Sequence, residues 1–293
     1  MRDEVTGWRR DFHAHPEVAF QENRTADRVA ALLESFGIEV HRGLAGTGVV
    51  GTLRAGTGSR AIALRADMDA LPMQEEADLP WRSEQPGCMH ACGHDGHMAM
   101  LLAAARVLST RLRFDGVVHF IFQPAEENEG GGRVMVEQGL FDRFPVEAVF
   151  GMHAIPGLAT GDFAVHLGPV MASADYFWVR VVGRGTHAAY AYRGADPIPA
   201  AAAIVLGLQT IVARSVDPLS SAVVSVTQIH GGTTLNVLPE VVELSGTVRA
   251  LSPEVRDLLE RRIGEVATGI AAARAKASVC TTNVRLLPAM KAR

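Results

Sequence analysis

The sequence is poor in cysteine and in aromatic residues, and it has no excess of positive charge. Only 3 of its 293 residues are cysteine, and 6% are aromatic. A small, odd number of cysteines argues against a disulfide-stapled secreted domain and favours a metal ligand or a reactive thiol. With 28 basic and 32 acidic residues, the formal net charge is −4. That balance argues against a protein that binds a nucleic-acid backbone.

Long apolar runs are also scarce. The N-terminus is charged from the start, with Arg2, Asp3 and Arg9, so no secretory signal is expected there. The longest apolar run, PIPAAAAIVLGLQTIVA at 197–213, contains two prolines and a glutamine. It predicts a buried helix rather than a membrane span. We therefore expect a cytoplasmic protein with no membrane or nucleic-acid partner.

The N-terminal half alternates between helical and strand-like segments. Helical spacing of apolar residues covers 3–14, 22–36, 94–112 and 131–139. Between them lie the strand-like segments GVVGTLR, AIALRAD, GVVHFIFQ and VEAVFGMH. Strands that are apolar on both faces and alternate with helices are typical of a buried α/β sheet. The pattern predicts an α/β domain with a mostly parallel sheet over residues 1–170.

The pattern changes near residue 171. The segments DYFWVRVVG, SAVVSVTQIHG and VVELSGTVRAL read as strands, helices are predicted at 197–214 and 252–273, and a last strand is expected near 277–285. The order β-α-β-β-α-β is the ferredoxin-like plan. We therefore predict a second domain at 171–285, followed by a short tail at 286–293.

Acidic, thiol and imidazole side chains gather at the ends of the predicted elements of the first domain. Three groups follow directly on strands, and a fourth opens the helix at 94–112. Open α/β sheets bind their ligands beside the carboxyl ends of the strands, so these groups are expected to meet at one rim. The four groups are Asp67 with Asp69, Glu126 with Glu127, His153, and Cys92 with His94.

Thiolate, imidazole and carboxylate ligands together suit zinc, manganese, cobalt or nickel. Taken singly, the groups have ordinary interpretations: His153 as a core histidine, ACGHDGH as a helix cap or structural zinc site, and AEE as a solvated turn. Cys88 has no second pair of ligands in the spacing of a four-ligand zinc site and is interpreted as structural. The combined H-x-E and P-C-x-x-C signature of zinc deaminases is absent. Together, the four groups predict a dinuclear metal site.

The adjacent glutamates suggest how such a site would act. Successive side chains leaving a strand point in opposite directions, so one of Glu126 and Glu127 is expected to bind metal while the other faces a water molecule. A bound metal lowers the pKa of water from about 15.7 toward ~7. The free glutamate would then act as a general base on this activated water and afterwards protonate the leaving nitrogen.

The motifs resemble one known family along most of the chain. In order, they are WRRDFHAHPEVAFQE, LRADMDALP, MHACGHDGHM, FIFQPAEE and GMHAIPGL, followed by GRGTHAA, GADPI, GGTTLNVLPE and GTVRAL. They are similar to the amidohydrolase branch of the aminoacylase/carboxypeptidase metallopeptidases, which includes hippurate hydrolases and N-acyl-amino-acid amidohydrolases. The resemblance covers about residues 4–275. It implies hydrolysis of N-acyl or N-aroyl amino acids and a ferredoxin-like domain, inserted in the catalytic domain, that serves as a lid and forms a homodimer.

The resemblance also implies roles for individual residues. Glu126 would be the general base, and Asp67 would have an active-site role, although Asp69 could instead be the residue that orients a ligand. An alternative for Arg249 is a solvated charge on a strand. Two divalent ions, manganese, zinc, nickel or cobalt, would be held by Cys92, His94, Glu127 and His153. The substrate-binding residues of the lid would be His187, Asn236 and Arg249.

Two features depart from the family pattern. In HAAYAYRGADP, Ala191 and Tyr192 stand where proline and histidine are usual. The family also continues beyond the lid into a segment with a last metal-binding histidine, which the ending CTTNVRLLPAMKAR does not resemble. From this we expect weak metal binding, poor amide hydrolysis and exposed apolar surface. The alternative function is therefore a truncated, catalytically silent relative that keeps the fold, the dimer interface or a partial metal site.

Overall fold

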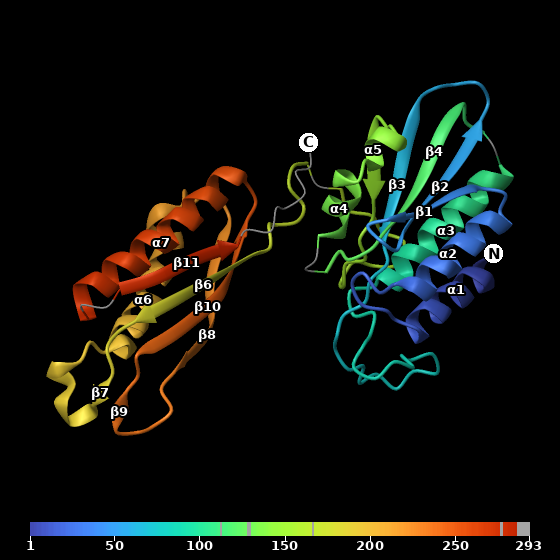
Figure 1. Cartoon of the computed structure of the whole chain (residues 1–293). Helices are drawn as coiled ribbons and strands as arrows, with labels where there is room; N and C mark the ends of the chain where they lie inside the picture. Colours follow the sequence, from blue (N-terminus) through green and yellow to red (C-terminus); the bar gives the residue numbers. More distant parts are fainter. Residues whose placement is uncertain (112, 128–129, 166, 276–277, 286–293) are drawn as a thin grey trace. The chain divides into compact units, whose positions relative to one another are not determined.

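The computed structural model describes residues 1–111, 113–127, 130–165, 167–275 and 278–285, and the chain divides into two compact units, Met1–Asp162 and Phe163–Arg293 (Figure 1). The boundary expected from the sequence, at 170/171, lies eight residues after this division. Ser173 belongs with the second unit, because its backbone N–H donates to the Ala250 carbonyl oxygen at 2.8 Å. The predicted tail at 286–293 lies outside the described residues.

The first unit is a mixed α/β structure with helices on both faces of a five-stranded sheet. Its strand order is β1-β2-β4-β3-β5. The helices α1, α2 and α3 pack on one face around Phe12, Leu102 and Phe120, and α4 and α5 cover the other face around Ile121 and Met135. The elements are α1 (Arg2–Ala14), α2 (Asn23–Ser35), β1 (Glu39–Leu44), β2 (Gly48–Ala55), β3 (Ala61–Asp67), α3 (His94–Thr110), β4 (Gly116–Gln123), α4 (Gly131–Glu137), α5 (Leu140–Arg143) and β5 (Ala148–Gly151).

The expectation of a mostly parallel sheet is not confirmed. Strand β3 pairs in parallel with β4 and β5, but β2 pairs antiparallel with both β1 and β4. The cause of the β1–β2 pairing is a tight turn in which Ala45 and Gly46 have positive φ angles, because only antiparallel strands can be joined so directly. Strand β1 itself was not predicted, since its sequence, EVHRGL, is largely polar and only one of its residues is buried.

The central strands place the expected residues together where their carboxyl ends meet. Asp67 at the end of β3 is the register partner of Gln123 at the end of β4. The backbone N–H of Met68 donates to the Gln123 carbonyl oxygen at 2.9 Å and continues the pairing. The edge strand β5, by contrast, exposes Val149 and Phe150, which are 45% and 56% accessible.

The second unit has the β-α-β-β-α-β order of a ferredoxin-like fold. Its four-stranded antiparallel sheet has the order β11-β6-β10-β8, and a second pair joins β7 to β9. Helices α6 and α7 pack on the sheet through a core that includes Phe177, Ile204 and Leu259. The elements are β6 (Asp175–Val182), β7 (Thr186–His187), the 3₁₀ helix Ala188–Arg193, α6 (Pro197–Ser215), β8 (Ala222–Gly231), β9 (Val237–Leu238), β10 (Val241–Ala250), α7 (Pro253–Ala275) and β11 (Ser278–Arg285).

Helix α6 is the apolar run identified in the sequence. By length and composition alone, it would be able to cross a membrane. In this fold one face of it is buried through Ile204, Leu208 and Ile211, whereas Leu206 on the other face is 72% exposed. The expectation of a buried helix therefore holds for one face only.

A buried ion pair fixes the start of β6 to α7. The Asp175 carboxylate is fully buried and accepts hydrogen bonds from Arg256 Nε at 3.0 and 3.1 Å and from Nη2 at 2.7 Å. Ser173 Oγ donates to the same carboxylate at 2.7 Å. Removing one member of such a buried pair is strongly destabilising.

We predict that Asp175→Ala destabilises the second unit by about 3–5 kcal/mol, because it leaves the Arg256 guanidinium without its buried carboxylate. The matched control is Glu243→Ala, which breaks the exposed Arg180–Glu243 pair on β6 and β10 and should cost less than about 1 kcal/mol. The loss of stability in each variant is measured by urea unfolding, with hydrogen exchange of the β6 and β10 amides as the local probe. Equal losses in the two variants would contradict the assignment.

Candidate active site

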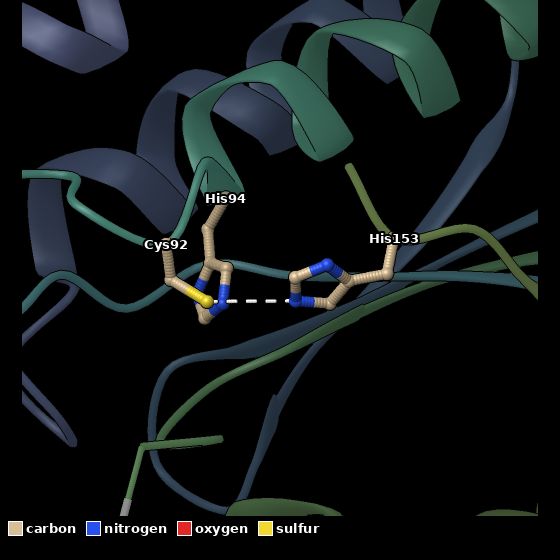
Figure 2. A group of neighbouring side chains, drawn as sticks. All are labelled: Cys92, His94 and His153. Atoms are coloured by element: carbon tan, nitrogen blue, oxygen red, sulfur yellow. Dashed lines mark hydrogen bonds between the residues drawn. The ribbon is translucent and has the colours of Figure 1, made fainter. Parts of the chain in front are cut away.

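The candidate site lies where β3, β4 and β5 end and α3 begins. Three groups of side chains there bring possible ligand atoms within 4.8 Å of one another, and His94 belongs to all three. Figure 2 shows the first group, in which the rings of His94 and His153 and the Cys92 sulfur point toward one another. The complete groups are Cys92, His94 and His153; His94, Glu126 and Glu127; and Asp67, His94 and His97.

The buried ring of His94 has one nitrogen tied to the backbone and the other free. Its Nδ1 lies 2.8 Å from the Asp69 carbonyl oxygen, and because a carbonyl can only accept, Nδ1 must carry the proton. Its Nε2 has no hydrogen-bond partner among the described residues. Around Nε2 lie carboxylate oxygens of Asp67 at 3.7 Å and of Glu126 and Glu127 at 3.9 Å each. A buried lone pair among three carboxylates is an environment that favours a cation.

The electrostatics of His94 agree with that geometry. Burial on its own would lower the pKa of His94, but the neighbouring Asp69 and Asp67 carboxylates outweigh it and raise the pKa. The carboxylates therefore favour a positive charge on or beside this ring. A divalent ion would occupy the same environment in place of the proton.

Cys92 and His153 complete the first group. His153 Nδ1 donates to the Ala154 carbonyl oxygen at 2.8 Å, which leaves Nε2 to face the Cys92 sulfur at 3.4 Å (Figure 2). Burial, followed by the neighbouring Glu127 carboxylate, raises the pKa of the Cys92 thiol to about 12. The thiol would therefore ionise only when a cation compensates its charge. Sulfur, imidazole and carboxylate donors arranged in this way fit a transition-metal centre.

The two aspartates at the end of β3 and just after it, Asp67 and Asp69, make different contacts. Asp67 Oδ1 accepts from His97 Nδ1 at 2.7 Å, and Oδ2 accepts from Arg65 Nη1 at 2.7 Å. Asp69 accepts the Glu127 backbone N–H on Oδ2 at 2.8 Å, and its carbonyl oxygen accepts from His94. Asp69 therefore has contacts that orient two candidate ligands, whereas Asp67 faces His94 with both of its oxygens already hydrogen-bonded.

Asp67 is held in its charged form. Burial would raise the pKa of Asp67, but the hydrogen bond from His97 and the Arg65 guanidinium outweigh it and lower the pKa well below the usual range. The carboxylate thus contributes a permanent negative charge beside His94 Nε2.

Glu126 and Glu127 do not point in opposite directions as expected. Carboxylate oxygens of both lie 3.9 Å from His94 Nε2. The reason is that the strand ends at Gln123, and Ala125 adopts a positive φ of 52° in the turn that follows. Glu22, whose side chain is buried, stabilises this turn by accepting the Ala125 N–H at 2.8 Å. The alternation of a strand therefore does not apply to this pair.

Two residues of this region were not identified from the sequence. Glu22 lies in α2's N-terminal flank, and nothing in its local pattern indicates that it reaches the turn at Ala125. His97 could have been found, because it follows His94 by three residues in a helix and so lies on the same face. Of the predicted residues, Asp67, Asp69, Cys92, His94, Glu126, Glu127 and His153 are brought together.

The residues predicted to bind substrate lie in the second unit, where two are adjacent and one is distant. His187 in β7 pairs with Val237 in β9, and the Ala188 N–H donates to the Asn236 carbonyl oxygen at 2.9 Å. His187 Nδ1 accepts the Ala189 N–H at 3.1 Å, so its exposed Nε2 is the hydrogen-bond donor. Arg249 lies toward the other end of β10, where Nη1 donates to the Val248 carbonyl oxygen at 2.9 Å.

The separation along β10 has a consequence for these three residues. Asn236 precedes Val241, where β10 begins, and Arg249 is the penultimate residue of the strand. The length from Val241 to Arg249 is roughly 27 Å at about 3.4 Å per residue. Within one copy of the chain, the side chains of Arg249 and Asn236 therefore cannot hold the same small carboxylate.

A buried network supports the start of α3 behind the candidate ligand side chains. His13 lies 2.9 Å from Asp95 Oδ2 through Nδ1 and 3.1 Å from Glu75 Oε1 through Nε2. Ionised carboxylates only accept hydrogen bonds, so both ring nitrogens of His13 are donors and the ring is cationic. The hydrogen bond to Asp95 raises the pKa of His13, with a second contribution from Glu75 and against the opposing effect of burial.

Comparison with known proteins gives three consistent matches. The family described as Peptidase family M20/M25/M40 matches residues 63–287. The chain is 44% identical to a hippurate hydrolase of Campylobacter jejuni, over 93% of this chain and 71% of the relative. It is also 44% identical to an N-acyl-L-amino acid amidohydrolase of Geobacillus stearothermophilus, over 92% and 73%.

A solved structure agrees with these relatives. It is a dinuclear metal-binding peptidase of the M20 family from Bacillus subtilis. It superposes with a TM-score of 0.82 at 39% identity, over 97% of this chain and 74% of that one.

We predict that Cys92→Ala lowers the divalent-metal content of the purified chain, because it removes the sulfur of the first group. Cys88→Ala is the matched control: Cys88 donates weakly to the Pro16 carbonyl oxygen at 3.6 Å and belongs to none of the three ligand groups. Metal analysis after dialysis against cobalt or manganese measures both. A loss in the Cys88 variant and none in the Cys92 variant would show that the wrong cysteine has been chosen.

We predict that the contribution of His13 to stability depends on pH. Because the folded pKa is raised above the unfolded value of 6.5, the contribution is fully present below about pH 6.5 and is lost as the pH rises through the folded pKa. The difference in urea-unfolding midpoint between the native chain and His13→Gln should therefore shrink with rising pH. Glu75→Gln should follow the same trend. A difference that stays constant across this range would contradict a cationic His13.

Proposed function

The chain belongs to peptidase family M20/M25/M40, whose members are metal-dependent hydrolases, and we propose that it hydrolyses the amide bond of N-acyl or N-aroyl amino acids. The observation that carries the proposal is the free, buried Nε2 of His94 among the carboxylates of Asp67, Glu126 and Glu127. The two relatives that are 44% identical to this chain are a hippurate hydrolase and an N-acyl-L-amino acid amidohydrolase. Their names support this substrate class.

We propose that Cys92, His94, Glu127 and His153 hold two divalent ions. Their donor atoms belong to two groups that share His94. The sulfur and the imidazoles favour zinc, cobalt or nickel over magnesium and calcium, and the carboxylates also suit manganese. Bound there, the ions would acidify a water molecule and polarise the amide carbonyl.

Glu126 is the proposed general base. Its side chain is 42% exposed, compared with 23% for Glu127, so it is the glutamate that water and substrate reach more easily. Burial, followed by the charges of Glu127 and Asp67, raises the pKa of Glu126. A raised pKa makes the carboxylate a better proton acceptor near neutral pH. Glu126 would take the proton from water and deliver it to the amide nitrogen as the carbon–nitrogen bond breaks.

Recognition of the substrate is proposed to involve the second unit. His187 presents a donor nitrogen, which suits a carbonyl or carboxylate oxygen, and Asn236 lies beside it. Arg249, at the other end of β10, would have to meet the substrate from a different copy of the chain if all three residues act on one molecule. That requirement supports a homodimer formed through this unit.

A second candidate is a catalytically silent relative with a partial metal site. The observation that favours it is that all three ligand groups in the described residues depend on the single imidazole of His94. Assays on hippurate and on N-acetyl amino acids, with manganese or cobalt added, separate the two candidates. Turnover that depends on the added metal would exclude the silent relative.

We predict that Glu126→Gln keeps the bound metal but slows hydrolysis by about 10²–10⁴-fold, since only the proton acceptor is removed. The matched comparison is Glu127→Gln, which should lower metal content as well as turnover. Metal analysis and a hydrolysis assay on the same preparations give both quantities. The roles would have to be exchanged if Glu126→Gln lost the metal while Glu127→Gln retained it.

A further inference from the structure

We propose that His97 is a positioning residue that holds two parts of the site at once, the carboxylate of Asp67 and the backbone beside His153. The inference rests on the proposed function, because it concerns the same site. His97 lies in α3, one turn after His94, and its side chain is 2% exposed. It belongs to one of the groups of possible metal ligands, so its role has to be decided from its hydrogen bonds.

The hydrogen bonds define which nitrogen of His97 carries the proton. The backbone N–H of Ala154 donates to His97 Nε2 at 2.9 Å, so Nε2 has no proton of its own. The remaining nitrogen, Nδ1, is therefore protonated and donates to Asp67 Oδ1 at 2.7 Å. Both nitrogens are occupied, and neither is left to bind a metal ion.

The contact with Ala154 anchors a segment that otherwise has few attachments. Between Met152 and Asp162, two hydrogen bonds join the described residues to other parts of the chain: Ala154 N–H to His97, and the Cys92 sulfur to His153. The rings of His97 and His153 also pack edge to face, with centroids 4.8 Å apart. His153 is itself exposed, so its position beside Cys92 depends on these contacts.

The contact with Asp67 acts on the other side of the site. With Oδ1 bound by His97 and Oδ2 bound by Arg65, the carboxylate is fixed in a plane that leaves Oδ2 3.7 Å from His94 Nε2. A single side chain thus connects the charge beside His94 with the segment that carries His153. His97 thus holds the two halves of the metal-binding group in place through its hydrogen bonds and its ring packing, without binding a metal ion itself.

Two substitutions separate the two contacts. In His97→Asn, the amide nitrogen reaches the position of Nδ1 and can donate to Asp67, but the side chain is too short to accept from Ala154. In His97→Gln, the amide oxygen reaches the position of Nε2 and can accept from Ala154, but the donor to Asp67 is lost. Each variant therefore serves as the control for the other.

The positioning role is tested on the metal-free chain by NMR with ¹⁵N labelling. In the native chain, a long-range ¹H–¹⁵N spectrum should show His97 protonated on Nδ1 only. The Ala154 amide should exchange with solvent about five- to tenfold faster in His97→Asn, as expected for loss of one hydrogen bond. In His97→Gln its exchange should stay close to that of the native chain. The proposal is overturned if Nε2 carries the proton, or if Ala154 exchanges equally in all three proteins.

The consequence for the metal centre is measured separately by cobalt titration. His97→Asn should weaken Co²⁺ binding by about 10–100-fold, the usual cost of losing a residue that supports a ligand. Unchanged Co²⁺ affinity in this variant would overturn the claim that the contacts of His97 support the metal-binding group. If the native chain bound no Co²⁺ at all, the proposed function would fail, while the Ala154 exchange rates would still decide whether His97 positions this segment.

Discussion

The hydrogen bond from His94 Nδ1 to the Asp69 carbonyl oxygen is the interaction on which the rest of the site depends. It fixes the proton on Nδ1 and so leaves the buried Nε2 as a lone pair facing three carboxylates. The same aspartate accepts the Glu127 backbone N–H, which helps to hold the Glu127 carboxylate near His94 Nε2. The end of β3, the turn after β4 and the first residue of α3 are thereby held around one point.

The surrounding contacts favour a cation at this point. Asp67 is kept ionised, the pKa values of His94 and Glu126 are raised, and that of Cys92 is raised to about 12. The carboxylates of Asp67, Glu126 and Glu127 repel one another around His94 Nε2, and Arg65 and His97 donate hydrogen bonds to Asp67 alone. A divalent ion would relieve this repulsion, and the structural cost of the site is therefore linked to its function.

Much of this arrangement was predictable from the sequence, and the exceptions have physical causes. The β3 and β4 strands, the start of α3 and the grouping of Cys92, His94 and the two glutamates follow from apolar runs that end in polar residues. The mixed sheet was missed because β1 is a polar edge strand and its pairing is set by a turn at Ala45. The prediction that Glu126 and Glu127 point in opposite directions was wrong, because the turn with a positive φ at Ala125 ends the alternation of the strand. The contact of Glu22 with Ala125 joins residues far apart in the chain, and local pattern cannot indicate it, whereas the place of His97 one turn after His94 could have been read from the sequence.

The most direct test follows the His94 ring while metal-free chain is titrated with zinc, which is diamagnetic and suits a long-range ¹H–¹⁵N spectrum. The account predicts that Nδ1 stays protonated throughout, and that the Nε2 resonance of His94 shifts as the first equivalents of zinc bind. Zinc binding that leaves the Nε2 resonance unchanged, or a His94 ring protonated on Nε2 and not on Nδ1 before zinc is added, would contradict it.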